Sequence, residues 1–116
     1  MLTIYVAKDY TETPGGRTRD DGDYSGEDFR ERFLEPNYLK AVENKVGLLV
    51  DLDGGYGYAP SFLEEAFGGL ARKYSADVET ILQVLTIKSD DEPGLIRKIA
   101  GYIQRVNNSK KVNVRA

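Results

Sequence analysis

The sequence contains no cysteine, no histidine and no tryptophan, and it has one methionine. The missing cysteines exclude disulfides and thiol nucleophiles, and the missing histidines exclude imidazole acid–base chemistry and serine–histidine triads. Without either residue type, the usual zinc sites are excluded as well. Long apolar runs are also absent, and no basic leader precedes an apolar stretch at the N-terminus. We therefore expect a cytoplasmic protein without membrane contact.

The chain has 116 residues, of which 41% are hydrophobic and 30% are charged, and this predicts one globular domain over residues 1–116. The net charge of -3 combines an acidic first part with a basic end. The basic end contains Arg97, Lys98, Arg105, Lys110, Lys111 and Arg115. These cations are suited to an acidic partner or to the C-terminal dipole of a helix. The acidic net charge argues against nucleic acid as that partner.

Segments rich in strand-forming residues alternate along the chain with helical patterns. We predict strands at Leu2–Ala7, Val46–Leu52 and Gln83–Lys88, with Val112–Val114 as a further edge strand. The near-continuous apolar run of Val46–Leu52 is typical of a strand covered on both faces. The alternation indicates an α/β fold, which we expect to be a small mixed β-sheet of four to five strands with helices packed on it.

The first half of the chain contains a long polar segment, followed by two helical stretches. Thr11–Tyr24 is rich in glycine and aspartate, which predicts a loop, and a loop this long in a small domain is either functional or mobile. Ser25 opens a helix that Pro36 is expected to break or kink. A second helical stretch is predicted at Asn37–Glu43.

The second half is predicted to contain three helical segments. The first begins at Ser61 and contains Gly68 and Gly69, each of which costs about 1 kcal/mol relative to alanine inside a helix. We therefore expect another group to approach the backbone at these glycines. A short helical piece is predicted at Ala76–Ile81. The final helix has one apolar stripe, formed by Leu95, Ile96, Ile99, Ile103 and Val106.

Three stretches together resemble a known family. They are LLVDLDGGYGYAPSFLEEAFGGL at Leu48–Leu70, SGEDFRERFLEP at Ser25–Pro36 and IKSDDEPGLIRKIAGYI at Ile87–Ile103. The combination resembles the bacterial STAS-like domains of unknown function, which are related to the STAS domains of anti-sigma factor antagonists. The resemblance implies a STAS-like fold and a regulatory role. In the antagonists, a partner ATPase kinase phosphorylates a serine at the start of a helix.

The resemblance places that phosphorylated serine at Ser61. A helix N-terminus presents the hydroxyl beside unpaired backbone N–H groups, and a phosphoryl group there adds roughly 1.5 to 2 negative charges. The alternative is that Ser61 only caps the helix, because Glu64 follows at the spacing of a capping box. Here the sequence departs from the antagonists, because Ala59 and Pro60 stand where those proteins carry an acidic and a small polar residue.

We interpret the chain as a non-enzymatic module that binds another protein without a cofactor. Tyrosines on an exposed loop are typical interface anchors, so Tyr56 and Tyr58 are candidate contacts, together with Glu64 and Glu65 on the following helix. The resemblance implies an ATP-binding regulatory kinase of the anti-sigma type as the partner. A partner-binding role in a phage or defence operon is an alternative, and the oligomeric state is left open.

A rival interpretation makes the chain an enzyme. Asp51 and Asp53, in Asp-Leu-Asp-Gly after an apolar strand, resemble the first motif of haloacid-dehalogenase-like phosphatases. In that family the first aspartate is the nucleophile, the second is the acid–base group, and Mg²⁺ is bound between them. Asp90 and Asp91 follow another apolar strand and are similar to that family's acidic metal motif. Gly55 departs from the pattern, because those phosphatases usually carry threonine or valine there.

Overall fold

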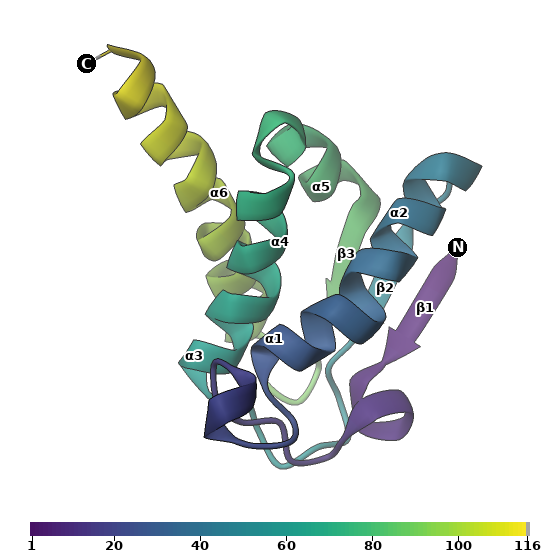
Figure 1. Cartoon of the computed structure of the whole chain (residues 1–116). Helices are drawn as coiled ribbons and strands as arrows, with labels where there is room; N and C mark the ends of the chain where they lie inside the picture. Colours follow the sequence, from purple (N-terminus) through teal and green to yellow (C-terminus); the bar gives the residue numbers. More distant parts are fainter. Residues whose placement is uncertain (116) are drawn as a thin grey trace.

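The structure is a computed structural model, which describes the backbone of residues 1–115 and the side chains of residues 1–106. Figure 1 shows a small sheet with helices beside it. No helix in this described part is long and apolar enough to span a bilayer. The side chains of Lys110, Lys111 and Arg115, which we assigned to a basic end, lie outside the described set.

The sheet consists of β1 (Leu2–Tyr5), β2 (Leu48–Asp51) and β3 (Leu85–Lys88), with β2 in the middle. Both strand pairs are parallel, so the sheet is not mixed. The expected four to five strands are not confirmed, because the backbone of residues 1–115 forms three. The edge strand predicted at Val112–Val114 is wrong, because those residues continue helix α6 (Gly94–Arg115). Extending an existing helix adds one hydrogen bond per residue, which outweighs a short valine-rich signal.

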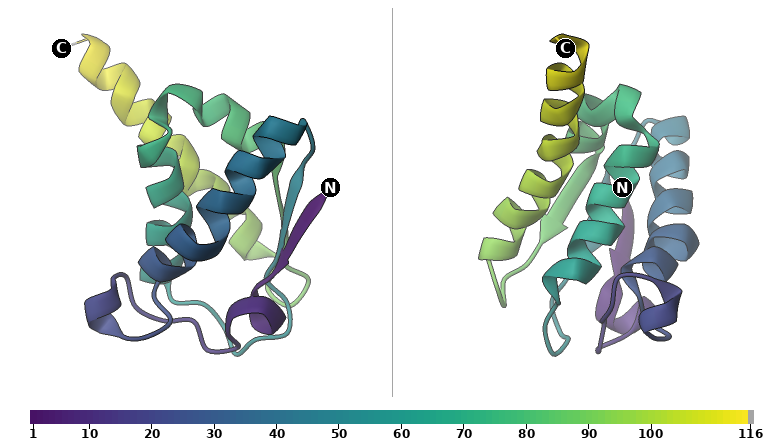
Figure 2. Two further views of the ribbon diagram at one scale, coloured as in Figure 1. Left: turned by 45° about the vertical axis from the view of Figure 1, so that its right-hand side comes forward. Right: turned by 60° about the vertical axis from the view of Figure 1, so that its left-hand side comes forward.

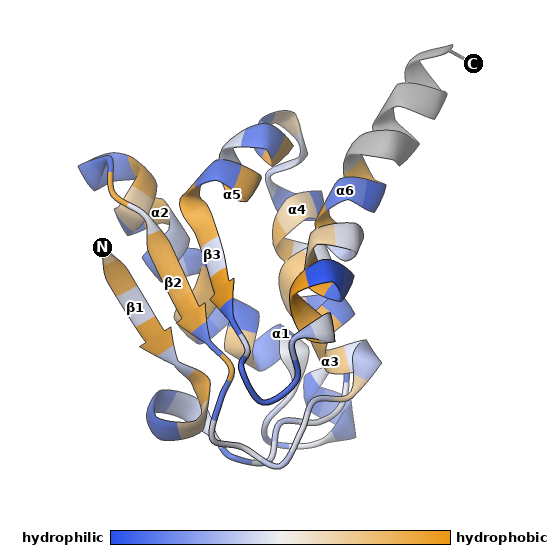
Figure 3. Cartoon of the chain, turned by 180° about the vertical axis from the view of Figure 1, so that it is seen from behind, coloured by the Kyte–Doolittle hydropathy of each residue, from blue (hydrophilic) through white to orange (hydrophobic). Residues whose placement is uncertain are grey.

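Helices cover one face of the sheet, and the other face is open (Figures 2 and 3). In β2, Leu48 and Val50 are buried under the helices, whereas Leu49 on the opposite face is half-buried. The prediction that this strand is covered on both faces is therefore wrong. Leu49 pairs in register with Thr3 on one side and Thr86 on the other. Its neighbours on the open face are therefore polar residues, which are compatible with solvent at that face.

The remaining helices are α1 (Gly26–Phe29), α2 (Glu35–Asn44), α3 (Pro60–Leu63), α4 (Gly69–Lys73) and α5 (Val78–Val84). A π turn joins α1 to α2, so residues 26–44 are helical throughout and Pro36 does not break the helix. The wider π turn, Arg30–Leu34, ends just before the proline, where a carbonyl lacks its usual donor. A second π turn joins α3 to α4, so residues 60–73 are also one helical segment.

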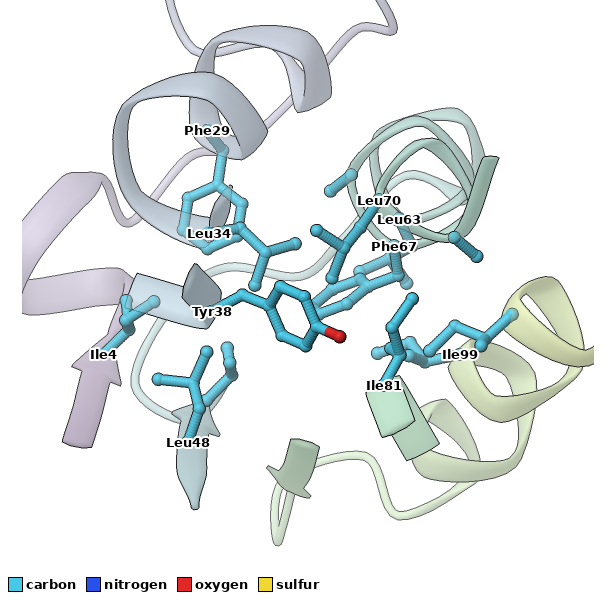
Figure 4. Close-up of a cluster of buried hydrophobic side chains, with 14 of the residues drawn as sticks. Ile4, Phe29, Leu34, Tyr38, Leu48, Leu63, Phe67, Leu70, Ile81 and Ile99 are labelled. Carbon is cyan, nitrogen blue, oxygen red and sulfur yellow. The ribbon is translucent and has the colours of Figure 1, made fainter. Parts of the chain in front are cut away.

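The core lies between the sheet and the helices (Figure 4). Tyr38 from α2 points its ring into the centre, with Ile4 and Leu48 of the sheet on one side and Ile99 of α6 on another. Phe67 contributes a fully buried ring from the α3–α4 segment. Each such side chain stabilises the fold by about 1.5–3 kcal/mol. The packing of the sheet, α2, the α3–α4 segment and α6 against one another therefore fixes the position at which the β2–α3 loop leaves the core.

The first helix crosses the start of α3 at close range. Gly26 is buried, and a Cβ atom there would overlap the carbonyl oxygen of Phe62 and lie 3.0 Å from Cβ of Glu65. A glycine is therefore required at Gly26 by the approach of another backbone. The hydroxyl oxygen of Ser25 accepts a hydrogen bond from the N–H of Asp28 at 3.1 Å, which confirms that Ser25 caps this helix.

The loop predicted at Thr11–Tyr24 is fastened to the first helix. The Tyr10 hydroxyl donates to the carboxylate of Asp28 at 2.8 Å, and Nε of Arg19 donates to the same carboxylate at 3.2 Å. Burial, and then the neighbouring Asp28, raise the pKa of Tyr10 above its usual value. These contacts attach Tyr10, just before the loop, and Arg19, within it, to α1.

Candidate functional site at the ends of the strands

The loop between β2 and α3, residues 52–59, is held by hydrogen bonds from its backbone N–H groups to distant segments. The N–H of Tyr56 donates to the carbonyl oxygen of Glu12 at 2.9 Å, and the N–H of Gly54 donates to the carboxylate of Asp91 at 3.0 Å. Gly54 has a φ of 94°, a conformation that favours glycine. The loop is therefore clamped between the residues that follow β1 and those that follow β3.

The two tyrosines of this loop have different environments. The side chain of Tyr56 is 84% exposed, whereas Tyr58 packs against Phe62, with 6.0 Å between ring centres. The Tyr58 hydroxyl donates to the carbonyl oxygen of Leu52 at 2.9 Å. Burial is the main cause that raises the pKa of Tyr58, and the nearby carboxylate of Asp51 adds to it. The structure thus leaves Tyr56 available to a partner and gives Tyr58 a role in supporting the loop.

Ser61 lies in the first turn of α3, and it is not the capping residue. Ala59 is the N-cap and Pro60 occupies the first helical position, where its fixed φ suits a helix. The capping interpretation of Ser61 is therefore wrong, and Glu64 does not complete a capping box with it. The Ser61 side chain is half-buried, and its hydroxyl forms no hydrogen bond with the side chains or backbone that the structure describes. Phosphorylation of Ser61 stays a prediction.

Glu64 and Glu65 are paired with arginines of the same chain. A carboxylate oxygen of Glu64 lies 2.5 Å from Nη1 of Arg17, and its other oxygen lies 2.6 Å from Nη1 of Arg72. The hydrogen bond from Arg72 is the main cause that lowers the pKa of Glu64. Glu65 forms an ion pair with Arg30, which is 13% exposed. These contacts attach the α3–α4 segment to the rest of the domain, and the predicted partner contact of both glutamates stays untested.

The glycine pair inside the helix makes room for this ion-pair network. A Cβ atom at Gly69 would overlap the guanidinium of Arg30, and one at Gly68 would lie 2.5 Å from a carboxylate oxygen of Glu64. The prediction that another group approaches the backbone here is confirmed. Nε of Arg30 also donates to the buried Glu35 at 2.9 Å. The sequence analysis did not identify Arg30 and Glu35. A glycine pair within a helix does, however, indicate that a long side chain crosses the helix at that point.

A lysine lies among the carboxylates that the phosphatase interpretation requires. Nζ of Lys88 is 2.6 Å from a carboxylate oxygen of Asp53, 2.9 Å from one of Asp90 and 3.9 Å from one of Asp51. The N–H of Asp91 donates to the other oxygen of Asp53 at 2.9 Å. That hydrogen bond, followed by the one from Lys88, lowers the pKa of Asp53 to about 2.

Lys88 was not predicted as part of the site, although its position gives a signal. It ends β3 in register with Asp51 at the end of β2, so the two strand ends place an ammonium beside a carboxylate. Among the described side chains, no group of three acidic residues is arranged to hold a metal ion. The structure therefore brings Asp51 and Asp53 together, as the phosphatase motif requires, but the ammonium group of Lys88 lies beside them.

The strand ends and the loops beside them carry excess negative charge. We call this surface the acidic edge, and it consists of Asp9, Glu12, Asp53, Asp90, Asp91 and Glu92, together with Tyr56. Most of these carboxylates are exposed, and the loops that carry them meet at one end of the molecule (Figure 3). Lys88 neutralises only part of the charge. The arrangement favours contact with a positively charged surface.

The chain matches a known protein family. A family model described as a STAS-like domain of unknown function matches residues 25–95, which confirms the resemblance inferred from the sequence. The matched range contains the β2–α3 loop, Ser61, both paired glutamates and Lys88. No curated protein and no solved structure matches the chain.

Proposed function

This chain belongs to the family of STAS-like domains of unknown function, and we propose that it is a regulatory module that acts by binding another protein. The observation that carries the proposal is the presentation of Tyr56. Its side chain is 84% exposed, yet its backbone is fixed by the hydrogen bond to Glu12. A rigid backbone lowers the entropy lost on binding, and an exposed tyrosine offers a large contact area with a polar tip.

The acidic edge defines the chemistry of the proposed partner. A partner surface that carries arginine or lysine would meet the carboxylates around Tyr56, and an arginine guanidinium would also stack on its ring. By resemblance to the anti-sigma antagonists, we propose an ATP-binding regulator of the kinase type as this partner. Tyr58 contributes by holding the loop through Leu52, and Glu64 and Glu65 contribute from the neighbouring helix.

Ser61 is the proposed phosphorylation site of this module. Its hydroxyl forms no hydrogen bond with the residues that the structure describes, and it lies in the first helical turn, where the dipole favours negative charge. The glutamates that follow it at Glu64 and Glu65 are neutralised by arginines, which reduces their repulsion of a phosphate. Ser61→Ala leaves the helix cap intact, so it should fold normally and lose only regulation. Intact mass of protein from its native host should show the phosphate, and its absence would count against the switch.

The phosphatase alternative is less well supported. Mg²⁺ would have to displace the ammonium of Lys88 from Asp53 and Asp90, which it contacts at 2.6 and 2.9 Å. The alternative predicts magnesium-dependent hydrolysis of a small phosphoester that Asp51→Asn abolishes. Turnover in a substrate panel with Mg²⁺ would favour it over the binding module, and no turnover would remove it.

Site-specific cross-linking tests the binding surface. A photo-reactive phenylalanine analogue at Tyr56 should give a single protein adduct in the native host, whereas the same analogue at Leu39, an exposed residue of α2, should not. The adduct then identifies the partner and separates an anti-sigma-type regulator from a protein of a phage or defence operon. With the purified partner, Tyr56→Ala should weaken binding roughly thirtyfold, because interface anchors contribute about 2 kcal/mol or more. Unchanged affinity would place the contact elsewhere.

A further inference from the structure

The outer edge of β3 carries unpaired backbone groups. In the parallel pair with β2, the N–H of Leu52 donates to the carbonyl oxygen of Lys88 at 2.8 Å. Backbone groups of successive strand residues point to opposite sides, so Thr86 also faces β2, whereas the N–H and C=O of Ile87 face the free edge. Within residues 1–115, no strand pairs with this edge.

An apolar groove runs beside the same edge, underneath α6. Leu85 and Ile87 of β3 and Ile99 and Ala100 of α6 line a hollow of about 130 Å³. Ile96 lines it too, although the periodicity of α6 placed it in the buried stripe, and it is 44% exposed. Figure 3 shows α6 lying beyond β3, on the side where the sheet has no further strand. The groove is thus the space that the side chains of a fourth strand would fill.

An exposed cation that forms no ion pair with the described side chains borders this groove. Arg97 lines the adjoining hollow together with Ile96 and Ala100, and its side chain is exposed. Among the described side chains it forms no ion pair, unlike Arg17, Arg30 and Arg72. A carboxylate on an incoming chain would therefore find a free guanidinium next to the apolar groove.

From these three features we infer that the β3 edge binds an extended acidic peptide segment of another protein, which adds a fourth strand to the sheet. Its backbone pairs with Ile87, alternate apolar side chains enter the groove under α6, and a carboxylate contacts Arg97. A second copy of the chain fits less well, because two-fold pairing of β3 strands would bring both α6 helices over the same junction. This site is separate from Tyr56 and does not rest on the proposed function.

The probe is a capped peptide of about eight residues in which valine alternates with threonine and two glutamates follow, so that one carboxylate lies on the same face as the valines and can reach Arg97. Titration into the ¹⁵N-labelled full chain should shift the amide signals of Ile87 and of the α6 residues beside it, and should slow exchange of the Ile87 amide. A second peptide of the same sequence carries N-methyl groups along the edge that faces β3. Because it cannot form the backbone hydrogen bonds, it should bind at least about tenfold more weakly.

Matched variants test the groove and the cation. Ile96→Glu should abolish binding, whereas Leu39→Glu, at a site 49% exposed on α2, should leave it unchanged. Arg97→Glu changes only an exposed charge and should weaken binding about tenfold through repulsion of the peptide carboxylates. Equal binding of the N-methylated peptide, signal shifts outside β3 and α6, or no binding of the first peptide would each overturn the proposal. Tyr56→Ala should bind the peptide like wild type, so failure here leaves the proposed function standing.

Discussion

Replacement of Gly26 by alanine tests the crossing of the first helix over α3. The added Cβ would overlap the carbonyl oxygen of Phe62 and approach Cβ of Glu65 to 3.0 Å. That carbonyl belongs to a helix backbone, so it has little freedom to move away. Overpacking of a buried contact costs about 1–3 kcal/mol. Because an alanine is otherwise favoured in a helix, we expect a net decrease in the free energy of unfolding of about 1–2 kcal/mol.

The matched control is Gly101→Ala in α6, where a Cβ atom meets no other atom within 4 Å. This variant should be more stable than wild type by up to about 1 kcal/mol, since alanine is the better helix former. Urea denaturation of both variants gives the two free energies, and the melting temperature of Gly26→Ala should fall by about 4 °C per kcal/mol lost. If Gly26→Ala were stabilised as much as Gly101→Ala, the close crossing at Phe62 would be refuted.

Three further predictions concern the site. Tyr58→Phe loses the hydrogen bond to Leu52 and should destabilise the chain by about 0.5–1.5 kcal/mol in urea denaturation. Arg30→Met removes the guanidinium that Glu35 and Glu65 share, and each glutamate keeps a weaker or more exposed cation, Lys73 and Arg17 respectively. The variant should therefore cost about 1–3 kcal/mol in the same measurement, and an unchanged stability would show that the shared ion pair does not stabilise the fold. The folded-state pKa of Asp53, about 2, is below its unfolded value, so its stabilising contribution is complete above about pH 4 and is lost as the pH falls toward 2. Asp53→Asn should flatten that part of the stability curve.

Local patterns predicted much of the fold. Ser25 caps its helix, and Leu95, Ile99 and Ile103 of the predicted α6 stripe are buried, because both features depend on neighbours within one or two helical turns. The glycines at Gly68 and Gly69 indicated a close approach, but not that the distant Arg30 makes it at Gly69. The helix start at Ser61 was misplaced because a serine followed by a glutamate resembles a capping box, whereas Pro60 is the better first residue of a helix.

Contacts between residues far apart in the sequence could not be predicted from local patterns. Arg30 contacts Glu65, and Lys88 contacts Asp53, although the residues of each pair lie on different elements. No local sequence pattern indicates that these elements are close in space. The backbone of the exposed Tyr56 is held by a hydrogen bond to the distant Glu12, which no local pattern indicates. The family resemblance located the region of interest, but it did not tell which of its side chains face solvent.

The central place of β2 has a consequence for how the chain folds. Within the described backbone, β1 and β3 each pair only with β2, and each pairing joins residues roughly forty apart in the sequence. Two large loops must therefore close before the sheet exists. Parallel pairing of this kind is slow compared with local helix formation. During synthesis on the ribosome, β1 therefore cannot pair until β2 has been made. We expect the folding nucleus to contain β2 together with the helices that flank it.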